Sequence, residues 1–250
     1  MQNTSMTTIL LRLFLAAGAL TLVVSYWGRE SLPPVGDILP DLAAEPVQTP
    51  TDAAPFKVDR DGYTAELTPR FHYEFAGLVV SYYDSNAWHD MTHRDDPFNT
   101  KDLCVLWGRN VASDVFHRVK FSHGEFTCWC RWDSAELGSR FNLNQIANNH
   151  IIPANDAVSR VLEEIRTGDQ VKVRGLLVDY RVRLPNGWGT RTTSTVRNDR
   201  GCEIIYADAV VVLRRGNLVF RALFDYSFYL VIGCLAVMAV RFVLSILGKR

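Results

Sequence analysis

The chain has 250 residues and carries 27 basic and 27 acidic side chains, so its formal net charge is zero. Hydrophobic residues make up 48% of the chain and aromatic residues 11%, which is enough to bury a core and excludes an intrinsically disordered protein. Without an excess of positive charge, nucleic acid is not expected as a partner, because such binding depends on the release of counterions from phosphates.

The first hydrophobic segment covers residues 9–27 and carries one charge, Arg12. As a helix it is long enough to cross the roughly 30 Å hydrocarbon core of a bilayer. We therefore expect a cytoplasmic segment over residues 1–8 and a transmembrane helix over residues 9–27. A cleaved signal peptide is the alternative, although no small-residue cleavage site precedes Tyr26 and Trp27. Small residues give this helix a face for close packing against another helix, namely Ala16, Gly18 and Ala19.

Residues 28–56 contain six of the ten prolines of the chain. Proline lacks a backbone donor and fixes φ, so this composition predicts an extended linker rather than a helix or a strand. Packing of the same segment against the folded domain as ordered coil is the alternative.

Residues 57–215 form the remaining unit, which we expect to be mainly β, of the α+β class. Its apolar runs are rich in β-branched and aromatic residues and are bounded by Gly, Asn, Asp and Pro, the pattern of strands. The predicted strands are Phe75–Tyr83, Leu103–Trp107, Phe116–Phe121, Phe126–Trp132, Gln170–Val182 and Glu203–Leu213.

A polar segment, WHDMTHRDD, contains the first candidate metal ligands. On a helix, its two histidines would share a face and could bind one metal ion. Pro97 follows closely and the segment lacks an apolar stripe, which favours a solvated loop instead. The candidate ligands for a metal site are His89, His93, Asp95 and Asp96, together with the distant His150.

Four of the five cysteines lie in the unit predicted to be outside the cytoplasm, where disulfides form. Cys128 and Cys130 are two residues apart on a predicted strand, so they share a face and are too close to pair with each other. Two structural disulfides, or one disulfide with two buried thiols, are both consistent with the pattern. The candidates are Cys104, Cys128, Cys130 and Cys202.

Residues 144–155 (NQIANNHIIPAN) are rich in asparagine, which favours turns, and we interpret them as a polar connector that holds His150. A helix is predicted next, over Asp156–Arg166, because Asn155 can cap it and apolar residues recur at helical spacing. Gly175 then interrupts a strand, which is typical of a bend in a small curved barrel. This favours an OB-like or related barrel or sandwich between the two hydrophobic ends of the chain.

The last hydrophobic segment, residues 228–247, predicts a second transmembrane helix after a juxtamembrane segment over residues 216–227. Residues 248–250 are expected to form a cytoplasmic tail. Basic side chains near one membrane face predict that both termini lie in the cytoplasm and that the domain lies in the periplasm of a bacterial inner membrane. The residues that carry this orientation are Arg12, Arg241, Lys249 and Arg250.

The combination of NNHIIPAN, GDQVKVRGLLVDY and TSTVRNDRGCEIIYADAVVVL, behind GLVVSYY and DLCVLWG, resembles a family of uncharacterised bacterial membrane-anchored proteins with a β-rich, OB-like extracytoplasmic domain. The resemblance covers most of residues 70–214. It implies a single folded domain and a setting in the bacterial envelope, but no assigned activity and no catalytic residues.

The sequence contains neither a nucleophile elbow, a P-loop nor a dinucleotide fingerprint. We therefore expect a non-catalytic accessory or interaction subunit of a membrane assembly, in contact with the bilayer and with an integral-membrane partner or further copies of itself, and without a cofactor. One alternative is a metal-dependent hydrolase that uses the histidines and aspartates above. Another is a ligand- or glycan-binding barrel whose stacking residues would be Trp88, Trp107, Trp129 and Trp132.

Overall fold

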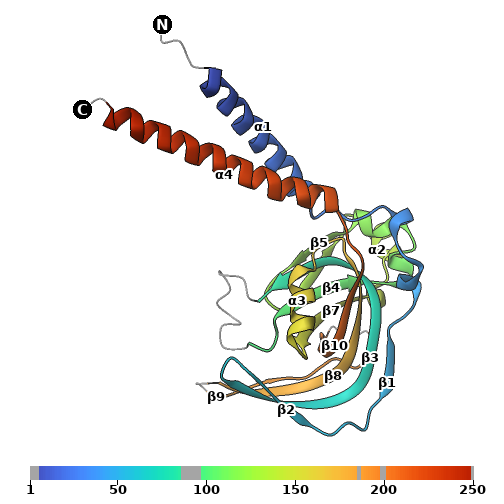
Figure 1. The fold of residues 1–250 in the computed structure, drawn as a ribbon. Helices are drawn as coiled ribbons and strands as arrows, with labels where there is room; N and C mark the ends of the chain where they lie inside the picture. Colours follow the sequence, from blue (N-terminus) through green and yellow to red (C-terminus); the bar gives the residue numbers. More distant parts are fainter. Residues whose placement is uncertain (1–5, 86–96, 185–186, 198–200, 249–250) are drawn as a thin grey trace. The chain divides into compact units, whose positions relative to one another are not determined.

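A computed structural model describes residues 6–85, 97–184, 187–197 and 201–248 (Figure 1). The chain divides into two compact units: the first combines both ends of the chain, up to Ser31 and from Asn217 onward, and the second is Leu32–Gly216. The structure is mixed α+β, with 37% strand and 38% helix, and has a large sheet and two apolar terminal helices. Since the terminal helices supply most of the helical residues, the second unit is dominated by its sheet.

The first unit is a pair of antiparallel helices, α1 (Met6–Gly28) and α4 (Leu218–Leu247). Gly18 of α1 lies against Leu230 of α4, and Arg241 near the far end of α4 donates to the Thr8 hydroxyl at 3.1 Å. Both helices are long and apolar enough to cross a membrane. The second helix begins ten residues before the expected span, so most of the expected juxtamembrane segment 216–227 forms its first turns.

The second unit contains an eight-stranded sheet in the order β1-β3-β4-β7-β10-β8-β9, with β2 added to β3. Because β8 also pairs with β3, the strands β3, β4, β7, β10 and β8 pair in a closed circuit. Among the strands that the structure describes, only β7 and β10 are parallel neighbours. The strands are β1 (Val47–Pro50), β2 (Phe56–Arg60), β3 (Tyr63–Asp84), β4 (Lys101–Leu106), β7 (Ile146–Pro153), β8 (Gln170–Leu184), β9 (Gly187–Arg191) and β10 (Glu203–Arg214).

One face of this sheet packs on helix α3 (Asp156–Glu164), which lies between β7 and β8. The Asn155 side chain caps the helix by accepting from the backbone N–H groups of Ala157 and Val158, as the sequence predicts. Val158 and Leu162 turn inward onto apolar side chains of the five strands of the circuit. The amphipathic spacing of this helix therefore determines which face of the sheet becomes the core.

The opposite face is covered by a second, smaller sheet and by short helices. Strands β5 (Lys120–His123) and β6 (Cys128–Arg131) form a hairpin, and helix α2 (Ala135–Arg140) follows it. The predicted strand Phe116–Phe121 is in part a 3₁₀ turn, Asp114–Arg118, which places Phe116 in the core. These elements cover the outer face of β4 and β7.

The sequence predicts no strand within residues 28–56, but Val47–Pro50 forms strand β1, which pairs with β3, and Leu32 onward belongs to the second unit. Leu42, in the 3₁₀ turn Pro40–Ala43, is fully buried. The Gln170 side chain accepts from the backbone N–H of Leu39 at 2.7 Å, and Glu45 accepts from the Trp107 indole at 2.7 Å. Side chains of the domain thus satisfy the backbone groups that prolines leave without a regular partner.

Gly175 is required by the close approach of two strands. A Cβ at this position of β8 would lie 2.1 Å from the carbonyl oxygen of Tyr206 and 2.9 Å from Cα of Ala207, both in β10. The register of β10 shifts just after this point, between Ala207 and Ala209, as expected for a bulge. The glycine therefore lets the two strands stay paired where they bend.

We predict that Gly175→Ala lowers the free energy of unfolding by at least about 2 kcal/mol, because backbone atoms of β10 have to move. The matched control is Gly36→Ala, since a Cβ at Gly36 meets nothing within 4 Å and should change stability by less than about 0.5 kcal/mol. Tryptophan fluorescence during thermal unfolding of the full chain in detergent measures both. Equal midpoints for the two variants would contradict the packing argument.

Candidate functional site

Strands β4 and β7, together with the residue just before β10, bring a carboxylate, an imidazole and a thiol close to one another. Asp102 of β4 lies opposite His150 of β7, and Ile204 of β10 lies opposite His150 from the other side. Cys202 precedes Ile204 by two residues, so its side chain is expected on the same face, because alternate residues of an extended chain share a face. Asp102 and Cys202, which are 48 and 52 residues from His150 in the sequence, are thus brought close to it by strand pairing.

The imidazole of His150 lies between the other two groups. Its Nδ1 is 2.6 Å from Oδ1 of Asp102. The thiol of Cys202 lies close enough to the ring to affect its pKa, and it donates to the Phe126 carbonyl at 3.7 Å. Asp102 is 0% exposed and His150 is 4% exposed, whereas Cys202 is only partly buried. Asn99 donates to the same carboxylate oxygen at 2.9 Å. The buried ion pair of Asp102 and His150 therefore lies next to a thiol, Cys202, that is partly exposed.

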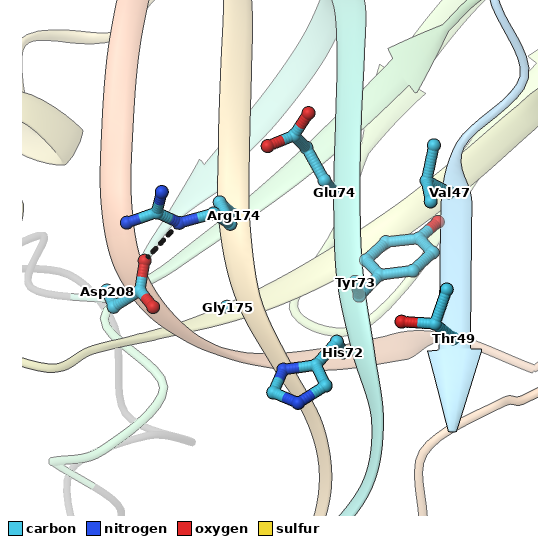
Figure 2. Close-up of a pocket in the computed structure, with 8 residues that line it drawn as sticks. All are labelled: Val47, Thr49, His72, Tyr73, Glu74, Arg174, Gly175 and Asp208. Carbon is cyan, nitrogen blue, oxygen red and sulfur yellow. Dashed lines mark hydrogen bonds and ion pairs between the residues drawn. The ribbon is translucent and has the colours of Figure 1, made fainter. Parts of the chain in front are cut away.

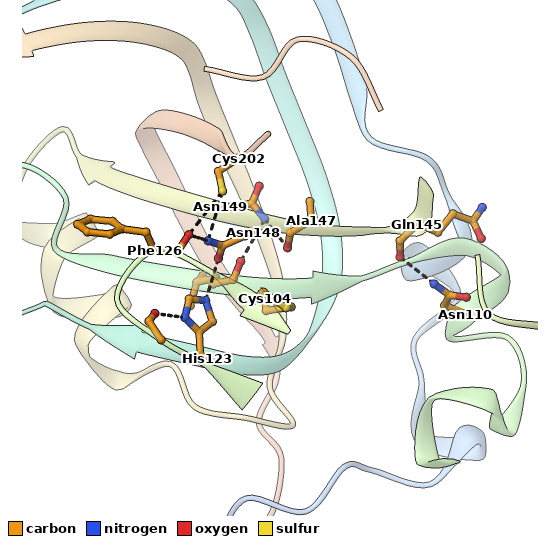
Figure 3. Close-up of a disulfide and its surroundings, with 12 residues drawn as sticks. Cys104, Asn110, His123, Phe126, Gln145, Ala147, Asn148, Asn149 and Cys202 are labelled. Carbon is orange, nitrogen blue, oxygen red and sulfur yellow. Dashed lines mark hydrogen bonds between the residues drawn. A yellow bond between two sulfur atoms is a disulfide. The ribbon is translucent and has the colours of Figure 1, made fainter. Parts of the chain in front are cut away.

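The thiol is also held by Asn148 and by the loop of the β5–β6 hairpin (Figure 3). The Asn148 amide nitrogen lies 3.6 Å from Sγ of Cys202 and donates to the carbonyl of Phe126 at 3.0 Å. His123 lies 2.8 Å from the Asn148 side-chain oxygen and fixes its orientation. The Phe126 ring centroid is 6.3 Å from that of His150 and covers the imidazole edge. Every side chain around Cys202 in this group is therefore itself anchored.

The protonation of His150 follows from these contacts. Burial alone lowers the pKa of an imidazole, but the interactions with Asp102 and Cys202 outweigh burial and raise the pKa of His150 to about 9. At neutral pH the ring is therefore a cation between a carboxylate and a thiol. The sulfur of Cys202 therefore lies beside a positive charge. The arrangement is chemically suited to nucleophilic attack by sulfur.

Of the four candidate disulfide cysteines, Cys104 and Cys128 form a disulfide that ties β4 to β6, with 5.7 Å between their Cα atoms. Cys130 and Cys202 are free thiols, and Cys234 is buried in α4. The arrangement with a single disulfide is therefore the one observed. Cys202 faces His150 rather than another sulfur.

The metal-site candidates His89, His93, Asp95 and Asp96 lie outside the described residues. His150 lies within them, on β7. In the part of the chain that the structure describes, no group of three or more His, Cys, Asp or Glu side chains is arranged to hold a metal ion.

The candidate stacking tryptophans that the structure describes differ in exposure. Trp107 is fully buried and donates to Glu45, while Trp129 and Trp132 are partly exposed. Trp88 lies outside the described residues.

The candidate helix-packing residues divide between two environments. Gly18 is buried between α1 and α4, whereas Ala16 and Ala19 are exposed. Among the orientation residues, Arg12 is exposed on α1 and Arg241 bonds to threonines at the start of α1. Lys249 and Arg250 lie outside the described residues.

A groove on another face of the domain has a volume of about 310 Å³ and is lined from β1, β3, β8 and β10 (Figure 2). Its charged side chains are paired: Arg174 with Asp208 at 2.9 Å, and Glu74 with Lys172 at 2.8 Å. All four are well exposed, so these pairs are weak surface interactions. The buried group at Cys202 is the stronger candidate for chemistry.

Lys101 is a second buried ionisable group that the sequence did not single out. It lies on β4 next to Asp102 but points to the opposite face, where its Nζ sits 4.7 Å from the Tyr82 ring and 3.3 Å from the Glu163 carbonyl. Burial lowers the pKa of Lys101 to about 8. The contacts hold the ammonium against the end of α3, which is a structural role.

Sequence reasoning missed the site because it interpreted residues 144–155 as a connector. The structure corrects this: Ile146–Pro153 is a central strand, paired on both sides. The pattern that points to a buried strand is the run from Ile146 to Pro153, whose only polar members are Asn148, Asn149 and His150.

Comparison with known proteins identifies no family: no family model matches the chain, and no curated protein or solved structure matches it. The function therefore has to follow from the geometry.

We predict that the stability of the chain depends on the protonation of His150. Because its pKa is raised in the folded state, the stabilisation is complete below pH 6.5 and is lost as the pH rises through about 9. The loss is on the order of 3 kcal/mol, at about 1.4 kcal/mol for each pKa unit. His150→Gln cannot titrate, so the difference between its unfolding midpoint and that of the natural protein should shrink from pH 6.5 to pH 9. A pH-independent difference would contradict the assignment.

Proposed function

We propose that the chain is a membrane-anchored interaction subunit of a bacterial membrane protein assembly, with its folded domain in the periplasm. The observation that carries the proposal is the pair of helices α1 and α4. Both are apolar, and only 6% of the most apolar 18-residue stretch of each helix is buried. Lipid or another membrane protein is the natural environment of such surfaces.

The basic residues of the helix pair support an orientation with both termini in the cytoplasm. Arg12 lies near the start of α1, and Arg241 reaches Thr7 and Thr8 at the same end of the pair. Arginines near the end of a span extend to the cytoplasmic interface. Arg29 and Arg221 lie at the other end, but long translocated domains tolerate such charges. Protease added to spheroplasts should digest the domain and spare tags on both termini; digestion of the tags would exclude this orientation.

The pairing order supports an OB-type barrel as the fold of the second unit. Five strands in the order β3-β4-β7-β10-β8 return to β3, and α3 connects β7 to β8, which are the third and fourth of these strands in chain order. An OB fold is a five-stranded Greek-key barrel whose second and third strands commonly form a binding face. In this chain those strands are β4 and β7, whose outer face carries Asp102 and His150. Ligand binding beside Cys202, which is partly exposed next to this covered face, is therefore the second candidate function.

We expect the interaction subunit to contact its partner through α1. Ala16 and Ala19 are exposed at a spacing of one turn, which allows close approach of another helix, while Gly18 is used against α4. The partner is either an integral-membrane protein or a second copy of the chain.

Native mass measurement after mild detergent extraction should show the chain in a complex, because α1 has this second packing face. The double variant Ala16→Leu/Ala19→Leu should release the monomer, since two larger side chains separate the helices. The matched control is Ala236→Leu/Ala239→Leu, which makes the same change at two exposed alanines of α4 and should keep the complex. A natural chain that is a clean monomer with no co-purifying protein would refute the proposed role.

A further inference from the structure

The free thiol beside His150 is arranged as a reactive group. We propose that Cys202 is the nucleophile of a Cys–His–Asp site that takes an acyl group from an ester or thioester. This inference does not rest on the anchoring role, and it replaces the sequence-based expectation of a non-catalytic domain with an activity.

The Asp102 carboxylate positions the imidazole. It holds Nδ1 of His150 at 2.6 Å and is itself fixed by Asn99, so Nε2 is the ring atom that remains for the thiol. Asp102 is fully buried, and its second oxygen has no hydrogen-bond partner among the described residues. A carboxylate held in this way keeps the ring in one orientation and stabilises its positive charge, the role of the third member of a nucleophilic triad.

A donor suitable for the developing oxyanion lies beside the sulfur. The Asn148 amide nitrogen is 3.6 Å from Sγ of Cys202, and its orientation is set by His123 and by the Phe126 carbonyl. Amide donors of this kind stabilise the negative oxygen of a tetrahedral intermediate when they are held in place beforehand. The Phe126 ring, under the guanidinium of Arg191 at 4.2 Å, gives the same place an apolar wall for the acyl group.

The reaction balances without any cofactor. The Cys202 thiolate attacks the acyl carbon and forms the C–S bond; the bond to the leaving oxygen or sulfur breaks, and His150 gives its Nε2 proton to the leaving group. Water then attacks the S-acyl intermediate and gives one proton to His150, and Cys202 departs as the thiolate. The sum is an ester or thioester plus water converted to an acid plus an alcohol or thiol. Esters and thioesters fit because a single proton donor, His150, serves the leaving group.

The first test compares two thiols of one protein. The full chain in detergent, without reductant so that the Cys104–Cys128 disulfide stays closed, is treated with iodoacetamide, and the labelled peptides are quantified by mass spectrometry. Cys130 is the internal control because it is also a free, partly buried thiol, and burial raises its pKa. At pH 6.5 we expect Cys202 to react at least ten-fold faster than Cys130, and His150→Gln to abolish that advantage.

The second test uses p-nitrophenyl acetate as the probe to detect the acyl intermediate. We expect a burst of p-nitrophenol and one acetyl group on Cys202, present in Cys130→Ser and absent in Cys202→Ala and His150→Gln. If His150→Gln fails to fold, the natural protein still decides, because Cys202 should react faster than Cys130 and should carry the acetyl group.

Equal reactivity of the two thiols would overturn the activation of Cys202. Fast alkylation of Cys202 without any acetyl adduct would overturn the acyl-transfer step. Neither result would bear on the helix-mediated assembly, which is measured separately by native mass.

Discussion

The hydrogen bond between the Asp102 carboxylate and the His150 imidazole is the contact on which the site depends. Both groups are buried, and a charge without a partner in that place would cost several kcal/mol, so each needs the other. Their pairing requires β4 and β7 to be neighbours in one register, and Cys202 reaches the ring only because β10 adds to the far edge of β7. The site therefore forms only when the sheet has this strand order and this register.

The surrounding structure supports this outer face of the sheet. The Cys104–Cys128 disulfide ties the β5–β6 hairpin to β4, and that hairpin supplies His123 and the Phe126 carbonyl, which orient Asn148. The opposite face is filled by apolar side chains and by α3, so it leaves the strands little freedom to shift. A large sheet covered by an anchored hairpin is a suitable scaffold for a reactive thiol, because small displacements would separate the sulfur from the imidazole.

The two-part organisation gives the zero net charge a physical meaning. The helices α1 and α4 concentrate the apolar residues of the chain. Leu32–Gly216 carries 25 acidic and 21 basic residues, and the two ends of the chain carry the other 2 acidic and 6 basic residues, so net charges of −4 and +4 cancel. Anchoring and chemistry then belong to different units and can be tested independently.

Strong local patterns predicted much of the fold, whereas the site depended on contacts between distant residues. The spans, the Asn155 cap and most strands follow from runs of apolar residues, and Gly175 indicated the bend. Strand β7 was missed because asparagine disfavours strands; in the structure Asn149 donates to the Leu103 carbonyl at 3.2 Å, so neighbouring strands satisfy it. The burial of Leu42 and the pairing of Cys202 with His150 likewise depend on tertiary contacts, which no local pattern reveals.

The central claim is that Asp102, His150 and Cys202 form one coupled site, and the pKa of His150 tests it most directly. Imidazole resonances of the full chain in detergent, followed by NMR across pH 5 to pH 10 and assigned with His150→Gln, give that value. The account predicts a pKa of about 9 for His150 and a clear decrease in Asp102→Asn. A pKa near the ordinary value of about 6.5 that Asp102→Asn leaves unchanged would contradict it.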